Sequence, residues 1–212
     1  MASIIAGAAH TAHSTAASLL SSAQIHPGKT LPPLKVKETS PERVETVQLS
    51  GTTIIVGVPG AFTGTCSAQI PGYIDNYEAF KAKGVTGIYV VAVNDQFVMN
   101  AWKEKLAPKG TPIHFLADDQ GEFAGATGLI FDATPLLGGP RSKRYVMIVK
   151  NQEVASVAVE EDPGKVTITD ADDSCAVVDG TSSNSSVRYF VESLASVILR
   201  DNLHLSSPAP AW

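Results

Sequence analysis

One cysteine, Cys66, stands among small and hydroxyl residues at positions 57–73, directly after an apolar run at positions 53–58. The run predicts a strand, Pro59-Gly60 ends it, and a helix is expected to begin near residues 63–67, so the thiol falls in its first turn. The thiolate is the nucleophile, and a free cysteine titrates near pH 8.5. The helix dipole favours an anion by only roughly 0.3–1 kcal/mol at an exposed site, so a reactive thiolate also needs a nearby cation. From these residues alone, Cys66 is either an ionised nucleophile or a buried, inert thiol.

Three residues could complete a thiolate site around Cys66. Arg144 begins the apolar stretch RYVMIV, where a side chain can be held rigidly at the end of a sheet. Thr63 could cap the helix through its hydroxyl, bond the thiolate or an oxygen substrate, or do both. Pro59 could shield the thiolate from water. Arg141 is interpreted as an exposed loop arginine.

Periodicity along the rest of the chain predicts alternating strands and helices. Strands are expected within residues 34–39, 53–58, 87–94 and 113–118, followed by a hairpin at 144–160. Helices are expected at 63–83 (kinked at Pro71), 97–106, 122–129 and 187–203, with the polar segment 170–186 as a loop. This order predicts an α/β sandwich with a mixed central β-sheet flanked by helices, compatible with a thioredoxin-like fold.

Composition describes an ordinary globular domain. The chain has 212 residues, 44% of them hydrophobic and 17% charged, and a net charge of −5. That charge gives no basic surface for nucleic acid or an anionic membrane, and no apolar run reaches the roughly 20 residues that span a bilayer. Two cysteines do not form a disulfide scaffold, which favours a reducing, cytoplasmic setting.

The two ends are expected to lie outside the domain. Residues 1–26 are interpreted as an N-terminal extension or short helix, residues 27–205 as one thioredoxin-like domain, and residues 206–212 as a tail. The Ala- and Ser-rich start has no Lys or Arg before Lys29, unlike a secretory or mitochondrial presequence. The final Pro-Ala-Trp is not a peroxisomal tripeptide. Cytoplasm is therefore the expected compartment, with mitochondrion and peroxisome as the alternatives.

Several other patterns favour structural roles. The histidines are scattered without the spacing of a zinc site, so no metal is expected. Gly138-Gly139-Pro140 is interpreted as a turn rather than a phosphate loop. Asp118 and Asp119 are expected to cap a turn, and Trp102 to pack in the core or at an interface.

The stretch PGAFTGTC at residues 59–66 resembles the active-site signature of the peroxiredoxins: Pro, three residues, Thr or Ser, two residues, Cys. With PGY shortly after, it is similar to the atypical peroxiredoxin-5 group, which includes many fungal members. Further stretches similar to this family follow in the family's order at residues 80–85, 90–102, 115–129 and 142–149. The resemblance covers residues 31–160.

This resemblance implies a thioredoxin-like fold and a thiol peroxidase that reduces hydrogen peroxide and alkyl hydroperoxides, serving antioxidant defence and cell redox homeostasis. Cys66 matches the peroxidatic cysteine, which becomes a sulfenic acid. Thr63 matches the hydroxyl that orients the peroxide, Arg144 the arginine that stabilises the developing charge, and Pro59 the residue that closes the pocket. No cofactor is implied. The family's reductants are thioredoxin, glutaredoxin or glutathione, and its members often form homodimers.

The sequence departs from the family pattern beside the thiol. Gly64 stands where a proline is common, CSAQIPG carries Gln69 and no histidine, and Pro71 follows Cys66 by five residues rather than six. The helix is therefore expected to be one residue shorter.

The second cysteine, Cys175, has two interpretations. It could resolve the sulfenic acid by forming a disulfide with Cys66, or it could be a surface thiol of a one-cysteine enzyme that external thiols reduce. Nearby carboxylates disfavour its thiolate: Asp170, Asp172, Asp173 and Asp179. Functions without fast turnover stay open as alternatives, namely a redox-sensing thioredoxin-fold protein or an oxidation-activated holdase.

Overall fold

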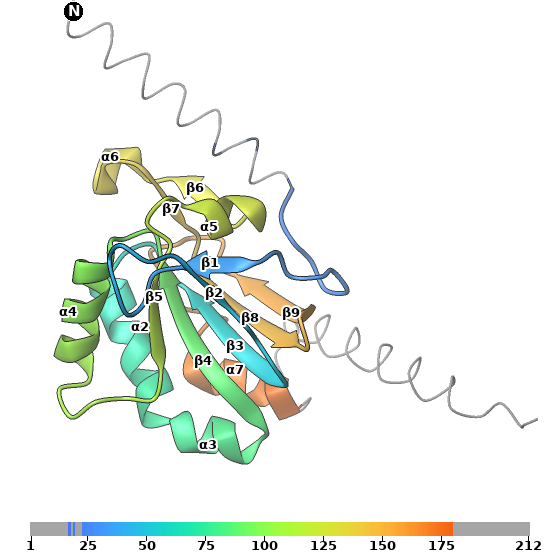
Figure 1. Ribbon diagram of the computed structural model, residues 1–212. Coiled ribbons are helices and arrows are strands. Elements are labelled where there is room, and N and C mark those ends of the chain that lie inside the picture. Colours follow the sequence, from blue (N-terminus) through green and yellow to red (C-terminus); the bar gives the residue numbers. More distant parts are fainter. Residues whose placement is uncertain (1–16, 18, 20–22, 180–212) are drawn as a thin grey trace, which may run out of the picture.

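The computed structural model describes residues 17, 19 and 23–179 (Figure 1). The helix expected at 187–203, most of the N-terminal extension and the tail at 206–212 lie outside the described residues. The elements are, in order, β1 (Leu34–Val36), β2 (Glu45–Val47), β3 (Thr52–Gly57), α2 (Gly64–Asp75), α3 (Tyr77–Ala82), β4 (Val85–Ala92), α4 (Gln96–Leu106), β5 (His114–Ala117), α5 (Glu122–Ala126), β6 (Ile130–Asp132), α6 (Thr134–Leu137), β7 (Pro140–Ser142), β8 (Tyr145–Lys150), β9 (Glu153–Val159) and α7 (Ala171–Asp179).

The central sheet has five strands in the order β5-β4-β3-β8-β9. Strands β3, β4 and β5 are parallel, whereas β8 is antiparallel to β3 and to β9. The sheet is therefore mixed, as predicted. The hairpin between β8 and β9 turns at Asn151 and Gln152, both of which have positive φ.

Both faces of the sheet are covered, so its central strands are apolar on both sides. Successive side chains of a strand point to opposite faces. Ile54 and Val56 of β3 accordingly join one core cluster, with residues from α2, α3, α4 and α7, while Ile55 joins a second cluster with residues from β1 and α5. Figure 1 shows α2, α3 and α4 along one side of the sheet. The thioredoxin-like arrangement of helices around a mixed sheet is confirmed.

Two expectations about helices were wrong. The helix predicted at 63–83 continues through Pro71 but stops at Asp75, because Asn76 leaves the helical conformation with a φ of −93° and a ψ of 10°. Its side-chain amide donates to the Gly72 carbonyl, and α3 follows as a separate helix. The segment at 170–186 is not simply a loop. Residues 171–179 form α7, whose first turn is capped by the Asp170 carboxylate and which buries Ala171 and Val177 in the core.

Three short elements between α5 and β8 were also not predicted from the sequence. Strands β6 and β7 pair with each other, and α6 connects them. The interpretation of Gly138-Gly139-Pro140 as a turn was correct in part, since Gly138 ends α6 with a φ of 77° but Pro140 already begins β7.

Candidate active site

Cys66 lies in the first turn of α2 and is fully buried. Strand β3 ends at Gly57, residues 58–63 cross from the sheet to the helix, and the first helical hydrogen bond runs from the Ser67 N–H to the Thr63 carbonyl at 2.9 Å. The thiol is thus at the positive end of the helix dipole, where a negative charge is favoured.

Arg144 meets the thiol because of the register of the sheet. Gly57, the last residue of β3, pairs with Tyr145, the first residue of β8, so Arg144 lies at the edge where the chain leaves for α2. Arg144 Nη2 donates to Cys66 Sγ at 3.4 Å. Only glycine fits at position 57, because a Cβ there would lie 2.0 Å from the Tyr145 ring.

The Arg144 side chain is 1% exposed and its position is fixed by three further hydrogen bonds to neutral oxygens. Nη1 donates to Gln69 Oε1 at 2.6 Å, and Nε and Nη2 donate to the Pro163 carbonyl at 3.0 and 2.7 Å. Within the described part of the chain, Arg144 forms no ion pair with a carboxylate. Its positive charge is therefore available to stabilise an anion on sulfur or on an oxygen bound beside it.

Thr63 and Pro59 lie in the segment that leads to the thiol. Thr63 is the N-cap residue of α2, yet its side chain makes no capping hydrogen bond, so the expected structural role of the hydroxyl is not observed. Pro59 is buried. The Asn94 side chain holds the loop by accepting a hydrogen bond from the Ala61 N–H at 3.0 Å, and Phe62 adopts a φ of 63°, which a bulky residue rarely does.

Residues that the sequence interpretation did not assign to the site support it. Gln69 was noted only as a departure from the family pattern, although its position one turn after Cys66 is a usable signal. Pro163 and Thr169 carried no such signal, because only the folded chain brings them to α2. Trp102 packs in the core, as expected, and its indole N–H also donates to the Ser67 hydroxyl at 3.1 Å.

Cys175 lies on α7, away from the start of α2. Helix α7 contacts α2 near its end, where the Ser174 hydroxyl is 2.8 Å from the Tyr73 hydroxyl, and the Cys175 carbonyl accepts from Lys83 beyond α3. Tyr73 is seven residues after Cys66, or roughly 10 Å along a helix. Both cysteines are free thiols in this structure.

The other candidates take the structural roles expected of them, with one correction. The Asp118 carboxylate caps α5 by accepting from the Phe123 and Ala124 N–H groups, and Asp119 pairs with Lys37 at 2.6 Å. Arg141 is half-buried rather than exposed, because its guanidinium donates to the Val93 and Leu137 carbonyls. Burial lowers the pKa of Arg141.

Neither a metal centre nor a membrane span is found among residues 17, 19 and 23–179. No group of three or more His, Cys, Asp or Glu side chains in these residues is arranged to hold a metal ion. None of their helices has the length and apolar character needed to cross a bilayer.

The fold and this site define a class: a thioredoxin-like protein with a buried cysteine at a helix start, beside a buried arginine. The family model described as Redoxin matches residues 26–174. Peroxisomal membrane associated protein 20 of Schizosaccharomyces pombe is 50% identical over 146 residues, which are 68% of this chain and 94% of that protein. The mitochondrial peroxiredoxin-2F of Arabidopsis thaliana is 42% identical over 120 residues, 56% of this chain and 59% of that one.

Solved structures agree with these relatives. A reduced Prx3 of Vibrio vulnificus, in complex with H2O2, has 36% sequence identity and a TM-score of 0.66, covering 73% of this chain and 99% of its own. The chain belongs to the Redoxin family and, within it, to the peroxiredoxins of the atypical peroxiredoxin-5 type. It is a thiol-dependent peroxidase, an oxidoreductase with an antioxidant function.

Proposed function

We propose that this protein reduces hydrogen peroxide and alkyl hydroperoxides at Cys66, with Arg144, Thr63 and Pro59 completing the site. The observation that carries the proposal is the 3.4 Å contact from Arg144 Nη2 to Cys66 Sγ, made by a buried guanidinium that no carboxylate neutralises among the described residues. The reduced Vibrio vulnificus Prx3 binds H2O2 in its crystal structure, which supports the same substrate here.

The chemistry follows from these positions. The Cys66 thiolate attacks one peroxide oxygen, so that an S–O bond forms while the O–O bond breaks, and the leaving oxygen takes a proton to become water or an alcohol. The sulfur is oxidised to a sulfenic acid and the peroxide is reduced. Arg144 stabilises the charge as it moves from sulfur to oxygen. The Thr63 hydroxyl, free of a capping bond, orients the peroxide, and buried Pro59 excludes water.

An external thiol is the proposed reductant, of the thioredoxin, glutaredoxin or glutathione class. One thiol attacks the sulfenic sulfur and releases water, and a second thiol cleaves the mixed disulfide. A disulfide with Cys175 would require the two Cα atoms to come within about 7 Å of each other. The hydrogen bonds of Tyr73 to Ser174 and to the Thr169 carbonyl hold α7 against α2 seven residues after Cys66, and they oppose a movement of Cys175 towards that thiol.

Assembly and compartment are further parts of this proposal. Large apolar side chains are exposed at Phe62 (49%), Phe97 (69%) and Leu136 (90%), which favours a homodimer. The named relatives include a peroxisomal membrane associated protein and a mitochondrial one. The low cysteine count, two in 212 residues, favours a reducing compartment, and cytoplasm is the proposed location.

The test is peroxide consumption by Cys66→Ser, with Cys175→Ser as the matched control. Cys66→Ser should lose turnover, whereas Cys175→Ser should retain it with an external thiol. The second-order rate of the wild-type thiol with peroxide separates a peroxidase from a sensor or holdase. A rate no faster than that of free cysteine, or full turnover by Cys66→Ser, would overturn the proposal.

A further inference from the structure

Gln69 connects the active-site arginine, through Thr169, to the buried carboxylate of Glu160. It is 5% exposed and lies one helical turn after Cys66. Its side-chain oxygen accepts from Arg144 Nη1 at 2.6 Å, while its nitrogen donates to the Thr169 carbonyl at 2.6 Å and to the Thr169 hydroxyl at 3.0 Å. Every polar atom of the amide is thus engaged, and its two ends have different partners.

The carboxylate belongs to Glu160, directly after β9, and is held by five hydrogen bonds. The backbone N–H groups of residues 167, 168 and 169 and the hydroxyls of Thr167 and Thr169 all donate to it, at 2.6–3.1 Å. Burial opposes its ionisation, but these donors outweigh burial and lower the pKa of Glu160. The Glu160 N–H also donates to the Arg144 carbonyl at 3.0 Å, so the same residue is tied to the arginine backbone.

The direction of this hydrogen-bond chain follows from the chemistry of its members. An ionised carboxylate only accepts, so the Thr169 hydroxyl must donate its single proton to Glu160. The lone pairs of that hydroxyl can then only accept, and they accept from the Gln69 nitrogen, which also donates to the Thr169 carbonyl. The Gln69 nitrogen therefore faces Thr169, and its oxygen faces Arg144. The reverse orientation would place amide N–H groups against guanidinium N–H groups.

We infer that Gln69 is a positioning residue for Arg144, and that Thr169 and Glu160 fix the orientation of its amide so that the guanidinium faces Cys66. The inference rests on the proposed function, because it says how the arginine of that site is held. The Pro163 carbonyl holds Nε and Nη2, and Gln69 is the acceptor for Nη1. Without Gln69, Nη1 loses a buried acceptor and the guanidinium can turn away from the sulfur.

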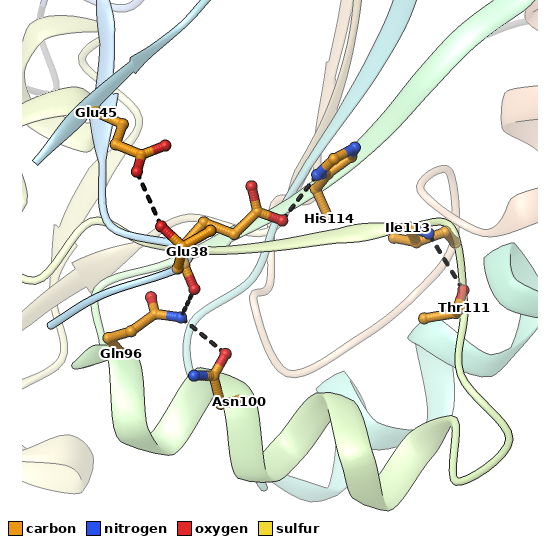
Figure 2. A network of polar contacts seen from close by, with 8 residues as sticks. Glu38, Glu45, Gln96, Asn100, Thr111, Ile113 and His114 are labelled. Carbon is orange, nitrogen blue, oxygen red and sulfur yellow. Dashed lines mark hydrogen bonds and ion pairs between the residues drawn. The ribbon is translucent and has the colours of Figure 1, made fainter. Parts of the chain in front are cut away.

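The test compares Gln69→Met with Gln96→Met. Gln96 is a matched control, because it is also buried, and its nitrogen likewise donates to a backbone carbonyl, that of Glu38, and to a side-chain oxygen, Asn100 Oδ1 (Figure 2). None of its hydrogen bonds reaches Arg144 or Cys66. The readouts are kcat/KM for hydrogen peroxide, the pH profile of Cys66 alkylation by iodoacetamide in a Cys175→Ser background, and thermal stability.

Gln69→Met should lower kcat/KM by roughly 10- to 100-fold, since a hydrogen bond to a charged group is lost. Its alkylation profile should move to higher pH, while that of Gln96→Met stays at the wild-type position despite a similar loss of stability. Equal shifts in the two variants, or a wild-type profile in Gln69→Met, would overturn the inference.

A second pair of variants, at Thr169, tests the inference if Gln69→Met fails to fold. Thr169→Val removes the hydroxyl and keeps the carbonyl, so it should lower kcat/KM by roughly two- to tenfold, and Thr169→Ser should restore it. Indistinguishable Val and Ser variants would contradict the role of Thr169. The alkylation profiles do not depend on turnover. They report on Gln69 even if wild-type protein consumes no peroxide, which would refute the proposed function instead.

Discussion

Replacing Arg144 by methionine tests the electrostatic basis of the site most directly. Methionine fills much of the arginine's volume but removes the charge and all of its donors. At an effective dielectric constant of about 20, unit charges 3.4 Å apart attract each other by about 5 kcal/mol. Even if only four-fifths of this attraction is present in the transition state, kcat/KM should fall roughly 1,000-fold.

Arg144→Lys separates charge from geometry. Lysine keeps the positive charge but cannot donate to Cys66, Gln69 and the Pro163 carbonyl at once, so an intermediate loss of roughly 10- to 100-fold is expected. Both variants leave buried acceptors unpaired, at a cost of about 1–3 kcal/mol for each, and should therefore unfold at lower temperature.

The assay is initial-rate consumption of hydrogen peroxide at saturating thiol, together with the rate of Cys66 alkylation at neutral pH. Arg43→Met is the control, since the Arg43 side chain is 75% exposed and forms an ion pair with Glu45 at 3.5 Å, away from Cys66. It should match wild type in both measurements. An Arg144→Met enzyme within threefold of wild type in kcat/KM would show that the guanidinium does not stabilise the reacting sulfur.

Three further predictions concern other parts of the molecule. Cys175→Ser should keep kcat/KM within about twofold of wild type, and the non-reducing mass of wild type after one equivalent of peroxide should show no internal disulfide; a 66–175 disulfide would contradict this. Gly57→Ala should unfold roughly 5 °C or more below wild type in calorimetry, because its Cβ would lie 2.0 Å from the Tyr145 ring, whereas Gly139→Ala, with open space around it, should not. Because the pKa of folded Glu160 is lowered, the stability it contributes is complete above its ordinary pKa of 4.5 and is lost as the pH falls through the lower folded value. Denaturant titrations should therefore show a flatter acid decline for Glu160→Gln, and parallel curves would refute the assignment.

The parts of the fold that the sequence predicted are those set by local patterns. The continuous apolar runs of β3 and β4 and the two β-rich runs of the β8–β9 hairpin depend on neighbours in sequence, and the structure confirms them. The break at Asn76 was missed because it lies in the backbone conformation of a single residue, and Pro71 was the stronger local signal. Helix α7 was missed because it begins a segment, 170–186, that is polar and Ser-rich as a whole, while its stability comes from a cap and from burial against α2.

In the active site, too, the residues that the sequence predicted are those marked by a local pattern. Cys66 and Thr63 could be placed from spacing, and Arg144 from its position before an apolar strand. Resemblance to the peroxiredoxins was needed to bring the arginine to the thiol, and the strand register gives the physical reason for that encounter. The residues that hold the arginine directly or through Gln69 could not be predicted, because Pro163 and Thr169 lie on a segment of irregular backbone after β9 that has no periodicity to interpret.

The segment after β9 also explains how a buried arginine can stay reactive. A buried guanidinium needs hydrogen-bond acceptors, and a carboxylate would satisfy it best, but a carboxylate would also neutralise the charge that the thiolate requires. Here the carboxylate is present, in Glu160, but its oxygens are occupied by backbone and hydroxyl donors. Gln69 and Thr169 stand between the two charges and transmit orientation without neutralising either. Exchanging Gln69 for glutamate should therefore be more damaging to catalysis than to stability, because it would supply Arg144 with a competing anion in place of a neutral acceptor.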